Sequence, residues 1–225
     1  MTRDERWLTA MWPFVKTHLP APPARVLELG CGAVGGFVPL LRGDGYDAIG
    51  VDPEAPAGEE YRRVRFEELE PLDGLDTVVA CTSLHHVEHA ADVISAVARC
   101  LRPHGTAIVV EWDWQGFDRA TAEWSFRRLG PNGDEGWLHR RRDDWAASGR
   151  SWDEYLPAWA GEHGLHPAGE LIRLLDERFE RLHLERGPYV FPDLDATEED
   201  ERAAIAASEI RATRIDYVGR LRNGA

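Results

Sequence analysis

The residues best suited to chemistry stand around a glycine-rich stretch at 28–36, which reads ELGCGAVGG. Its central GCGAVG fits the spacing G-x-G-x-x-G, in which glycines let the chain turn sharply between a strand and a helix and approach a nucleotide-like ligand. Asp52 follows about 20 residues after Gly30, where an acid can hold ribose hydroxyls. A nicotinamide dinucleotide and S-adenosylmethionine both suit this arrangement, so the turn alone leaves the cofactor open.

Glu28 favours the second cofactor. It falls within the apolar run before the turn, and an unpaired carboxylate in a buried strand is costly. A dehydrogenase turn normally has an apolar residue here, whereas the ammonium and sulfonium of S-adenosylmethionine give a nearby carboxylate an electrostatic reason. The sequence also lacks a Tyr-x-x-x-Lys pair, because Lys16 is its only lysine.

Histidines in SLHHVEH, residues 83–89, supply the candidate bases. They follow the predicted fourth strand, at the edge of the sheet where ligands bind in such folds, and a histidine titrates near neutral pH. We expect His85 to face the acceptor and His86 to cap or pack the next helix. The alternative is that both histidines begin a helix and take no part in chemistry.

Two acids end the predicted fifth strand near the same edge, Glu111 and Asp113. Either could orient a histidine or bind an acceptor hydroxyl, or both could be solvated ends of a strand. The catalytic candidates are therefore His85, His86 and Glu111. His85 and His89 have a spacing that metal ligands can use on a helix, but no third ligand stands near them, so we expect no metal.

Apolar runs that alternate with helical segments must position these residues. The runs are 25–29, 46–52, 75–82 and 105–112, with a more polar run at 61–66 that suits an outer strand. Helical periodicity covers 3–18, 35–42 and 90–102. Continuous apolar strands separated by helices are typical of a parallel sheet covered on both faces.

The composition changes after residue 112: most of the nine tryptophans fall between 112 and 159. We expect three or four short helices there, with turns at 130–136 and 147–151, forming a lid over the acceptor. Residues 167–178 predict a further helix and 179–191 a strand. A last helix begins at Thr197 and runs to about Thr213, and 215–222 predict a last strand.

The aromatic residues of this segment divide into two groups. Trp112 and Trp114 flank the expected cleft and are candidate walls for a planar or apolar acceptor. The helical spacing of Trp152, Tyr155, Leu156 and Trp159 is more typical of core residues. The arginines at 140–142 could bind an anionic acceptor, and a solvated helix face explains them equally well.

Composition narrows the partners. The 225 residues carry 26 Lys and Arg against 40 Asp and Glu, a formal net charge of −14, which argues against a nucleic-acid partner. Cys31, Cys81 and Cys100 form no C-x-x-C pair and predict no disulfide framework. The sequence has no apolar run of membrane-spanning length and no signal peptide, so we expect a cytoplasmic protein without a membrane partner.

Four segments in order resemble the class I S-adenosylmethionine-dependent methyltransferases, and most closely their small-molecule branch: VLELGCG, GVDP, LDTVVACTSLHHVEH and CLRPHGTAIVVEW. The resemblance is strong over residues 24–113 and weak beyond them. It implies S-adenosylmethionine as cofactor and methyl transfer to a hydroxyl or amine of a small, aromatic or apolar metabolite. The alternatives are a lyase, cyclase or regulatory module that binds the same cofactor without transferring its methyl group, and an NAD-dependent oxidoreductase.

The resemblance also implies roles for core residues. Gly30 and Gly32 would line the methionine and ribose portion of the cofactor through their backbone. Glu28 would help to hold the methionine end through water. Asp52 would accept both ribose hydroxyls, and Pro53 would lie against the adenine.

The resemblance also implies cofactor contacts at the ends of the third and fourth strands. Phe66 or Glu67 would meet the adenine ring or its amino group. Cys81 and Thr82 would offer backbone groups to the ammonium of the cofactor. The family usually has a third glycine where this chain has Val34, so no contact is carried onto that residue.

We therefore predict an α/β fold: a doubly wound, mostly parallel seven-stranded sheet of the Rossmann-like methyltransferase type, with a helical insertion after the fifth strand. We expect a single methyltransferase domain over residues 1–225. Within it, 19–113 would bind S-adenosylmethionine, 114–178 would form the acceptor lid, and 179–225 would supply the C-terminal strands and helix. The sequence leaves the acceptor and the oligomeric state open.

Overall fold

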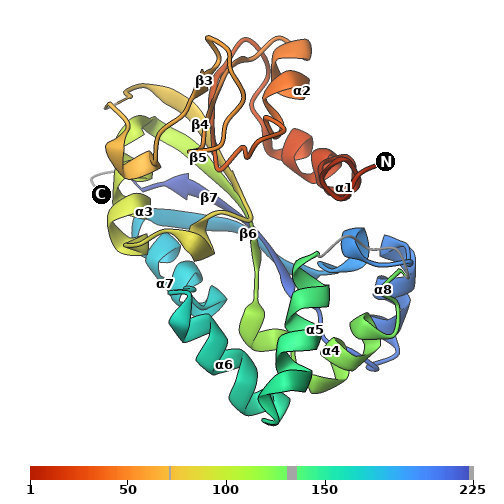
Figure 1. Cartoon of the computed structure of the whole chain (residues 1–225). Helices are drawn as coiled ribbons and strands as arrows, with labels where there is room; N and C mark the ends of the chain where they lie inside the picture. Colours follow the sequence, from red (N-terminus) through yellow and green to blue (C-terminus); the bar gives the residue numbers. More distant parts are fainter. Residues whose placement is uncertain (71, 131–135, 223–225) are drawn as a thin grey trace.

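One sheet of seven strands runs through the part of the chain that the computed structural model describes, residues 1–70, 72–130 and 136–222 (Figure 1). The strands are β1 (Arg25–Leu29), β2 (Asp47–Val51), β3 (Tyr61–Arg62), β4 (Leu75–Cys81), β5 (Leu101–Trp112), β6 (Phe179–Gly187) and β7 (Arg214–Leu221). Their order across the sheet is β3-β2-β1-β4-β5-β7-β6. All pairs from β3 to β5 are parallel, and β7 is antiparallel to both of its neighbours. The predicted doubly wound, mostly parallel sheet is confirmed.

Helices cover this sheet and extend beyond it. In the described residues they are α1 (Arg3–His18), α2 (Val38–Gly43), α3 (Ala90–Cys100), α4 (Arg119–Phe126), α5 (Trp137–Ser148), α6 (Trp152–Glu162), α7 (Ala168–Arg178) and α8 (Glu198–Ala206). Four short 3₁₀ turns join them: η1 (Phe66–Glu68), η2 (Leu84–His86), η3 (Trp114–Gly116) and η4 (Phe191–Asp193). Because α4 to α7 stand between β5 and β6, the predicted helical insertion after the fifth strand is confirmed.

The two faces of β1 show how the sequence divides the core. Side chains alternate across a strand, so Val26 joins the apolar cluster that contains residues of α1 and α2. Leu27 and Leu29 join the cluster that contains residues of α3 and α7. Glu28 shares the parity of Val26 and is directed to the α2 side, where it is 1% exposed. The strand alternation therefore sets this carboxyl under the glycine turn.

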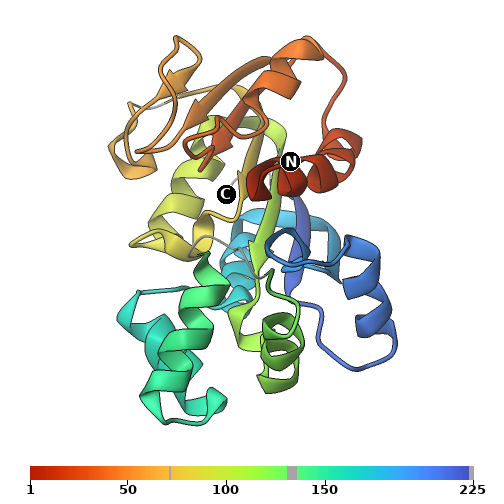
Figure 2. The ribbon, with the colours of Figure 1, turned by 45° about the vertical axis from the view of Figure 1, so that its right-hand side comes forward.

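The four helices inserted between β5 and β6 do not all lie in the same part of the molecule. Helices α4, α5 and α6 lie past the carboxyl end of β5, as a separate group in the lower part of Figures 1 and 2. Helix α7 packs instead against α3, with Leu171, Leu174 and Leu175 in the core cluster on that face of the sheet. Of the residues expected to form a lid, those of α7 thus help to cover the sheet.

Helix α1 starts with a capping box, in which Thr2 and Glu5 satisfy each other's backbone N–H groups. It buries Trp7, Met11 and Val15 and continues through Pro13. Its N-terminal turns are fastened to the C-terminal part of the chain, because Arg6 donates to the carbonyls of residues 192, 194 and 196. This fixes α1 at the carboxyl edge of the sheet.

Several boundaries differ from the prediction. The polar run at 61–66 forms only the two residues of β3, at the edge of the sheet, and then turns into η1. Helix α8 ends at Ala206 and not near residue 213, because the chain reverses at Ser208, where φ is 59°. The turn predicted at 130–136 falls largely on residues 131–135, which lie outside the described residues.

Candidate cofactor and acceptor site

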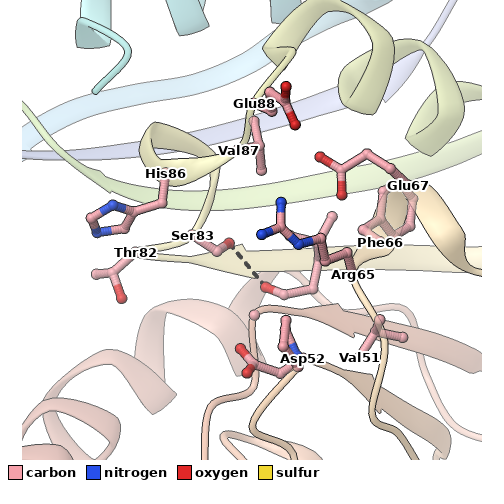
Figure 3. A pocket seen from close by; sticks show the side chains of 13 residues that line it. Val51, Asp52, Arg65, Phe66, Glu67, Thr82, Ser83, His86, Val87 and Glu88 are labelled. Atoms are coloured by element: carbon pink, nitrogen blue, oxygen red, sulfur yellow. Dashed lines mark hydrogen bonds between the residues drawn. The ribbon is translucent and has the colours of Figure 1, made fainter. Parts of the chain in front are cut away.

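A cavity of about 310 Å³ opens where the strand order reverses between β1 and β4 (Figure 3). Ligands bind at such a switch point because the loops after the two strands separate there. The cavity is lined by residues that follow β1, β2, β3 and β4. The predicted cofactor residues among them are Gly30, Asp52, Pro53, Phe66 and Glu67.

Gly30 is required by the geometry of this edge. Its φ is +81°, a conformation that side chains rarely allow, and a Cβ built on it would overlap the side chain of Ser83. The Ser83 hydroxyl donates to the Leu29 carbonyl at 3.0 Å, which draws the loop after β4 against the end of β1. The two loops are thus closed together at the floor of the cavity, as the dashed line in Figure 3 shows.

A second cavity, of about 130 Å³, continues from the first. Gly30 and Thr82 line both cavities. The second is also lined by residues predicted to hold the methionine end of the cofactor, Glu28, Gly32 and Cys81, and by Val34. The two spaces adjoin at these shared residues and together make up a groove along the carboxyl edge of β1 and β4.

Glu28 supports the turn as well as lining the groove. One of its oxygens accepts the backbone N–H of Phe37 at 2.7 Å, at the start of α2. A Cβ on Gly36, whose φ is +57°, would overlap the same carboxyl group. This explains why glycines stand at 35 and 36 while Val34 replaces the usual third glycine: the turn is longer, and the Glu28 carboxyl occupies the space beside Gly36.

Burial raises the pKa of Glu28 to about 8, and the nearby charge of Asp52 adds to the effect, although the Phe37 and Val38 backbone bonds oppose it. The group therefore titrates near neutral pH. A cation placed in the smaller cavity would favour the ionised carboxylate, because it would supply the opposite charge that the buried site lacks. The chemistry of this position fits the cationic end of S-adenosylmethionine.

Asp52 follows β2 and directs its side chain toward the larger cavity (Figure 3). Its Oδ1 accepts the backbone N–H of Glu54 at 2.7 Å, which fixes the carboxylate. Its other oxygen makes no hydrogen bond within the described residues. This is the arrangement that an acid needs in order to accept ribose hydroxyls.

Thr82 stands where the two cavities join. Its φ is 55°, in the left-handed region that β-branched residues rarely adopt. Its backbone N–H donates to the Val110 carbonyl at 2.7 Å. Beside it, the Cys81 thiol accepts the indole N–H of Trp7 at 3.1 Å, and burial raises the pKa of that thiol, so it stays protonated. Cys81 therefore lines the groove as a neutral group.

The two histidines face differently from the prediction. His86 lines the larger cavity, whereas His85 is 3% exposed and does not line either cavity. The expectation that His85 faces the cleft while His86 packs a helix is wrong for this structure. The reason is that residues 84–86 form the 3₁₀ turn η2 and not the first turn of α3, which starts at Ala90. Burial and the adjacent His85 lower the pKa of His86 to about 4, so its ring is neutral near pH 7.

Glu111 orients His85, which is one of the two roles that the sequence suggested for it. The Nδ1 of His85 is hydrogen-bonded to Oε2 of Glu111, and both side chains are buried. The other carboxyl oxygen accepts the backbone N–H groups of Ser83 and Leu84, at 2.8 and 2.6 Å. A carboxylate can only accept, so Nδ1 of His85 is the donor and carries a proton.

Asp113, the second acid at this edge, does not reach a histidine. It forms an ion pair with Arg186 from β6. It lies 7% exposed at the junction of β5, β6 and β7. Its role is to join the C-terminal strands to the end of β5.

Trp112 and Trp114 were expected to form walls of the acceptor pocket, and neither lines the cavities described above. They are 3% and 8% exposed and belong to the aromatic core. Trp112 stacks on Tyr189 at 5.9 Å and meets the His85 ring edge-on at 6.1 Å. Of the four residues assigned to the core, Trp152, Tyr155 and Leu156 are buried, and Trp159 is partly buried against the same cluster.

Sequence reasoning missed the contribution of α1. Arg3, Asp4, Trp7 and Leu8 line the smaller cavity, so the helix covers the end of the groove where the methionine portion was expected. The basic residue is held by Asp193, which accepts from Nε of Arg3 at 2.8 Å. No local sequence motif could predict that α1 covers the groove, because the contact that holds it joins residues 190 positions apart.

Two further findings concern metal binding and membrane insertion. Within residues 1–70, 72–130 and 136–222 there is no group of three or more His, Cys, Asp or Glu side chains placed to hold a metal ion. In the same residues no helix is long and apolar enough to cross a membrane.

The family described as a methyltransferase domain matches residues 4–179, and the chain belongs to it. The chain is a class I S-adenosylmethionine-dependent methyltransferase, and S-adenosylmethionine is its cofactor. The resemblance of the four sequence segments to that class is thereby confirmed.

Individual relatives differ in what they modify. The ubiquinone biosynthesis O-methyltransferase of Rhodopseudomonas palustris (strain TIE-1) is 31% identical over 130 residues, which are 50% of this chain and 51% of that protein. The tRNA U34 carboxymethyltransferase of Azotobacter vinelandii is 32% identical over 125 residues, covering 47% of this chain and 38% of that protein. The chain thus spans about half the length, or less, of the curated relatives it matches.

The fold recurs in solved structures over almost the whole chain. An S-adenosylmethionine dependent methyltransferase from Mesorhizobium loti matches with a TM-score of 0.59 and 22% identity, covering 94% of this chain and 97% of that one. At this level of identity the match shows a common fold.

Proposed function

We propose that this protein transfers the methyl group of S-adenosylmethionine to a hydroxyl or amine of a small, aromatic or apolar acceptor. The observation that carries the proposal is the groove along β1 and β4, whose lining includes His86, with the buried His85–Glu111 pair behind that ring. S-adenosylmethionine supplies an electrophilic methyl group, and the acceptor must supply an electron pair in line with it. The chain has to bind, align and, for a hydroxyl, remove a proton.

The residues of the groove divide into two binding ends. Asp52 would accept the ribose hydroxyls, with Pro53, Phe66 and Glu67 around the adenine. Glu28 would balance the cationic methionine end from the smaller cavity, and Arg3 of α1 stands where it could meet the methionine carboxylate. Opposite charges at the two sides of the smaller cavity suit the zwitterionic tail of the cofactor.

The pair of His85 and Glu111 supports a base for the acceptor. Glu111 keeps the proton on Nδ1, so Nε2 of His85 can take the proton from an acceptor hydroxyl as the methyl group is transferred. The buried carboxylate would then stabilise the imidazolium that forms. His86 lies against the His85 ring at 4.0 Å and is neutral, so it would border the reacting groups without carrying charge.

Related proteins offer a precedent for the acceptor class. The Rhodopseudomonas relative is named for O-methyl transfer in ubiquinone biosynthesis. The formal net charge of −14 supports a small molecule over a polyanion such as tRNA. We therefore place this chain with methyltransferases of small metabolites.

Calorimetry with S-adenosylhomocysteine and NAD is the first test, and we expect only the former to bind. Turnover is then followed as S-adenosylhomocysteine released from S-adenosylmethionine in the presence of fractionated metabolite extracts. Asp52→Ala, which should bind the cofactor about 10- to 1000-fold more weakly, is the control. Binding without any release of S-adenosylhomocysteine from any fraction would favour the non-methylating alternative, and NAD binding alone would overturn the proposal.

A further inference from the structure

Four buried polar atoms beneath the lid have no hydrogen-bond partner within the described residues. They are the indole N–H groups of Trp112 and Trp159, Nη1 of Arg141 and the hydroxyl of Tyr155. Such atoms are rare in folded proteins, because each loses its water without replacement. Elsewhere in the lid, Trp152 donates to the Phe117 carbonyl at 2.7 Å and Trp145 to the Arg150 carbonyl at 3.0 Å. The indole N–H groups of Trp114 and Trp124 also lack a partner within the described residues, but neither ring is paired with a buried arginine as Trp159 is with Arg141.

The four residues form one cluster. The guanidinium of Arg141 lies over the ring of Trp159, 4.4 Å from its centroid. Trp159 is 6.4 Å from Trp112, centroid to centroid. Tyr155 stands one turn before Trp159 on α6, on the same side of the helix, and it feels the charge of Arg141. Helices α5 and α6 and the end of β5 each contribute.

The chemistry of the cluster is one-sided. Indole and guanidinium nitrogens donate and never accept, and the hydroxyl keeps its proton because burial raises the pKa of Tyr155. The Tyr155 oxygen could accept from one of these donors, but in this structure it does not. An acceptor placed among the four groups would satisfy the nitrogen donors, and a negatively charged acceptor would also pair with the guanidinium of Arg141. Arg141 is 9% exposed, and its other terminal nitrogen donates to Asp144 at 2.7 Å.

The cluster is connected to the candidate base. Trp112 bridges the two, since its ring meets the His85 ring at 6.1 Å on one side and the Trp159 ring at 6.4 Å on the other. A planar acceptor that replaced or displaced part of this aromatic packing would have its reacting group toward His85 and its far end toward Arg141. The separation by one aromatic side chain suits a single substituted ring.

We propose that Arg141, Tyr155 and Trp159 bind a carboxylate carried by the methyl acceptor, and so make an aromatic acid the substrate class of this site. The inference rests on the function proposed above. Because the four atoms have no surface open to solvent, the acid enters only when α5 and α6 move apart from β5. Binding of the acid and closure of these helices are then one event.

The test measures binding of matched aromatic probes to the full chain saturated with S-adenosylhomocysteine, by calorimetry. The probes are 4-hydroxybenzoate and 3,4-dihydroxybenzoate, with their neutral amides, and inorganic phosphate. We expect the acids to bind at least about 10-fold more tightly than the amides, since one charge-assisted hydrogen bond is lost with the charge. Arg141→Met should reduce the affinity for the acids by roughly 10- to 100-fold and leave that for the amides unchanged.

Two control variants separate binding from folding. Arg142→Met removes an exposed arginine of the same helix, one that pairs with Asp143, and should leave every affinity unchanged. Arg141→Met should melt at the same temperature as the wild type or higher, because it removes an unsatisfied buried group. Tyr155→Phe, which removes only the hydroxyl, should weaken acid binding by a smaller factor.

Three outcomes would overturn the inference: equal affinity for acid and amide, an Arg141→Met protein that binds the acids as the wild type does, or no acid bound at up to about 10 mM. Phosphate that binds more tightly than every acid would overturn the carboxylate specifically. A chain that fails to bind S-adenosylhomocysteine defeats the proposed function instead, so the two failures are distinguishable.

Discussion

The cofactor half of the molecule and the acceptor half are built in opposite ways. Between β1 and β4 the backbone of the site is held by glycines and by the hydrogen bond from Ser83 to the Leu29 carbonyl, and a few side chains such as Asp52 and Phe66 line the cavity around it. Beyond β5 large side chains from β5, α5 and α6 are brought together and pack on one another. One half is shaped before its ligand arrives, and the other has polar atoms that still lack a partner.

This difference between the two halves indicates where the specificity for a ligand can change. A cofactor common to many enzymes suits a site whose backbone geometry tolerates few substitutions. An acceptor suits a site made of side chains, because those can be exchanged without disturbing the sheet. Substitutions in the two halves should therefore differ in kind: loss of cofactor binding and folding in the first, loss of turnover with the cofactor site intact in the second.

Gly30→Ala should give the largest effect in the cofactor half. A Cβ there meets the Ser83 side chain, and the residue must also keep a φ of +81°. We expect the affinity for S-adenosylhomocysteine to fall by more than about 1000-fold, together with a lower melting temperature, because strain and overlap add. Gly43→Ala is the matched control, since nothing lies within 4 Å of a Cβ at that position. A Gly30→Ala protein with near-normal affinity would show that the backbone shape is not what binds the cofactor.

His85→Ala should impair the acceptor half alone. If His85 is the base, turnover falls by roughly 10²- to 10⁴-fold, while the affinity for S-adenosylhomocysteine stays near that of the wild type. Raising the pH should recover part of the loss in His85→Ala, because the acceptor hydroxyl then ionises unaided. Turnover within a few-fold of the wild type would mean that alignment suffices.

His86→Ala provides the contrast for that measurement. Its ring lines the larger cavity, so we expect a weaker affinity for S-adenosylhomocysteine and a smaller effect on turnover at saturating cofactor. The reverse pattern in the two variants would exchange the roles of His85 and His86.

Asp52→Ala should lower the affinity for S-adenosylhomocysteine by about 10- to 1000-fold, because two charge-assisted hydrogen bonds to the ribose would be lost. The fold should survive, since this side chain is only partly buried. Glu54→Ala, which removes an exposed carboxylate two positions along, controls for the change in net charge. Unchanged affinity in Asp52→Ala would mean that the ribose is held elsewhere.

Glu28→Gln should give the most specific effect, a change in pH dependence. The folded pKa of Glu28, about 8, lies above its ordinary value of 4.5, so the folded state holds a proton that the unfolded state has lost. Its contribution to the free energy of unfolding is full below about pH 4.5 and is lost as the pH rises from there through 8, by up to about 5 kcal/mol. Between about pH 4.5 and 8 the free protein should therefore lose stability through this group, and Glu28→Gln should not.

Over the same pH range, cofactor affinity should change in the opposite direction to the free energy of unfolding. A cationic ligand end prefers ionised Glu28, so the affinity for S-adenosylmethionine should rise with pH in the wild type and less so in Glu28→Gln. The ligand's own ammonium titrates in both proteins and cancels in the comparison. His86 does not confuse the result, because its folded pKa of about 4 places its influence at lower pH. Parallel pH profiles for the two proteins would remove Glu28 from the methionine end.

The sequence could predict the cofactor half because its determinants are local. The glycine turn, the acid after β2 and the histidines after β4 each follow a strand, and parallel strands bring their carboxyl ends to one edge. Glu28 could be placed in the same way, from the alternation of a single strand.

The acceptor half escaped prediction because its determinants are distant contacts. Whether Trp112 walls a cavity or fills the core depends on Tyr189 and Trp159, which meet it from other parts of the chain. The prediction reversed the positions of His85 and His86 because residues 84–86 form a 3₁₀ turn. That turn differs from the expected helix start by less than one helical turn. The coverage of the groove by α1 required a contact across nearly the whole chain.

The position of β7 has a consequence for how the chain reaches this structure during synthesis. β6 pairs only with β7 in the described sheet, and β7 fills the place between β6 and β5 over Thr106–Trp112. A nascent chain can therefore assemble β1 to β5 early, but the edge of β5 stays unpaired until residues 214–221 have left the ribosome. Until then that edge is open to pairing with other chains. We expect translation past residue 221 to close the sheet, and only then the aromatic core around Trp112 and Tyr189 to form.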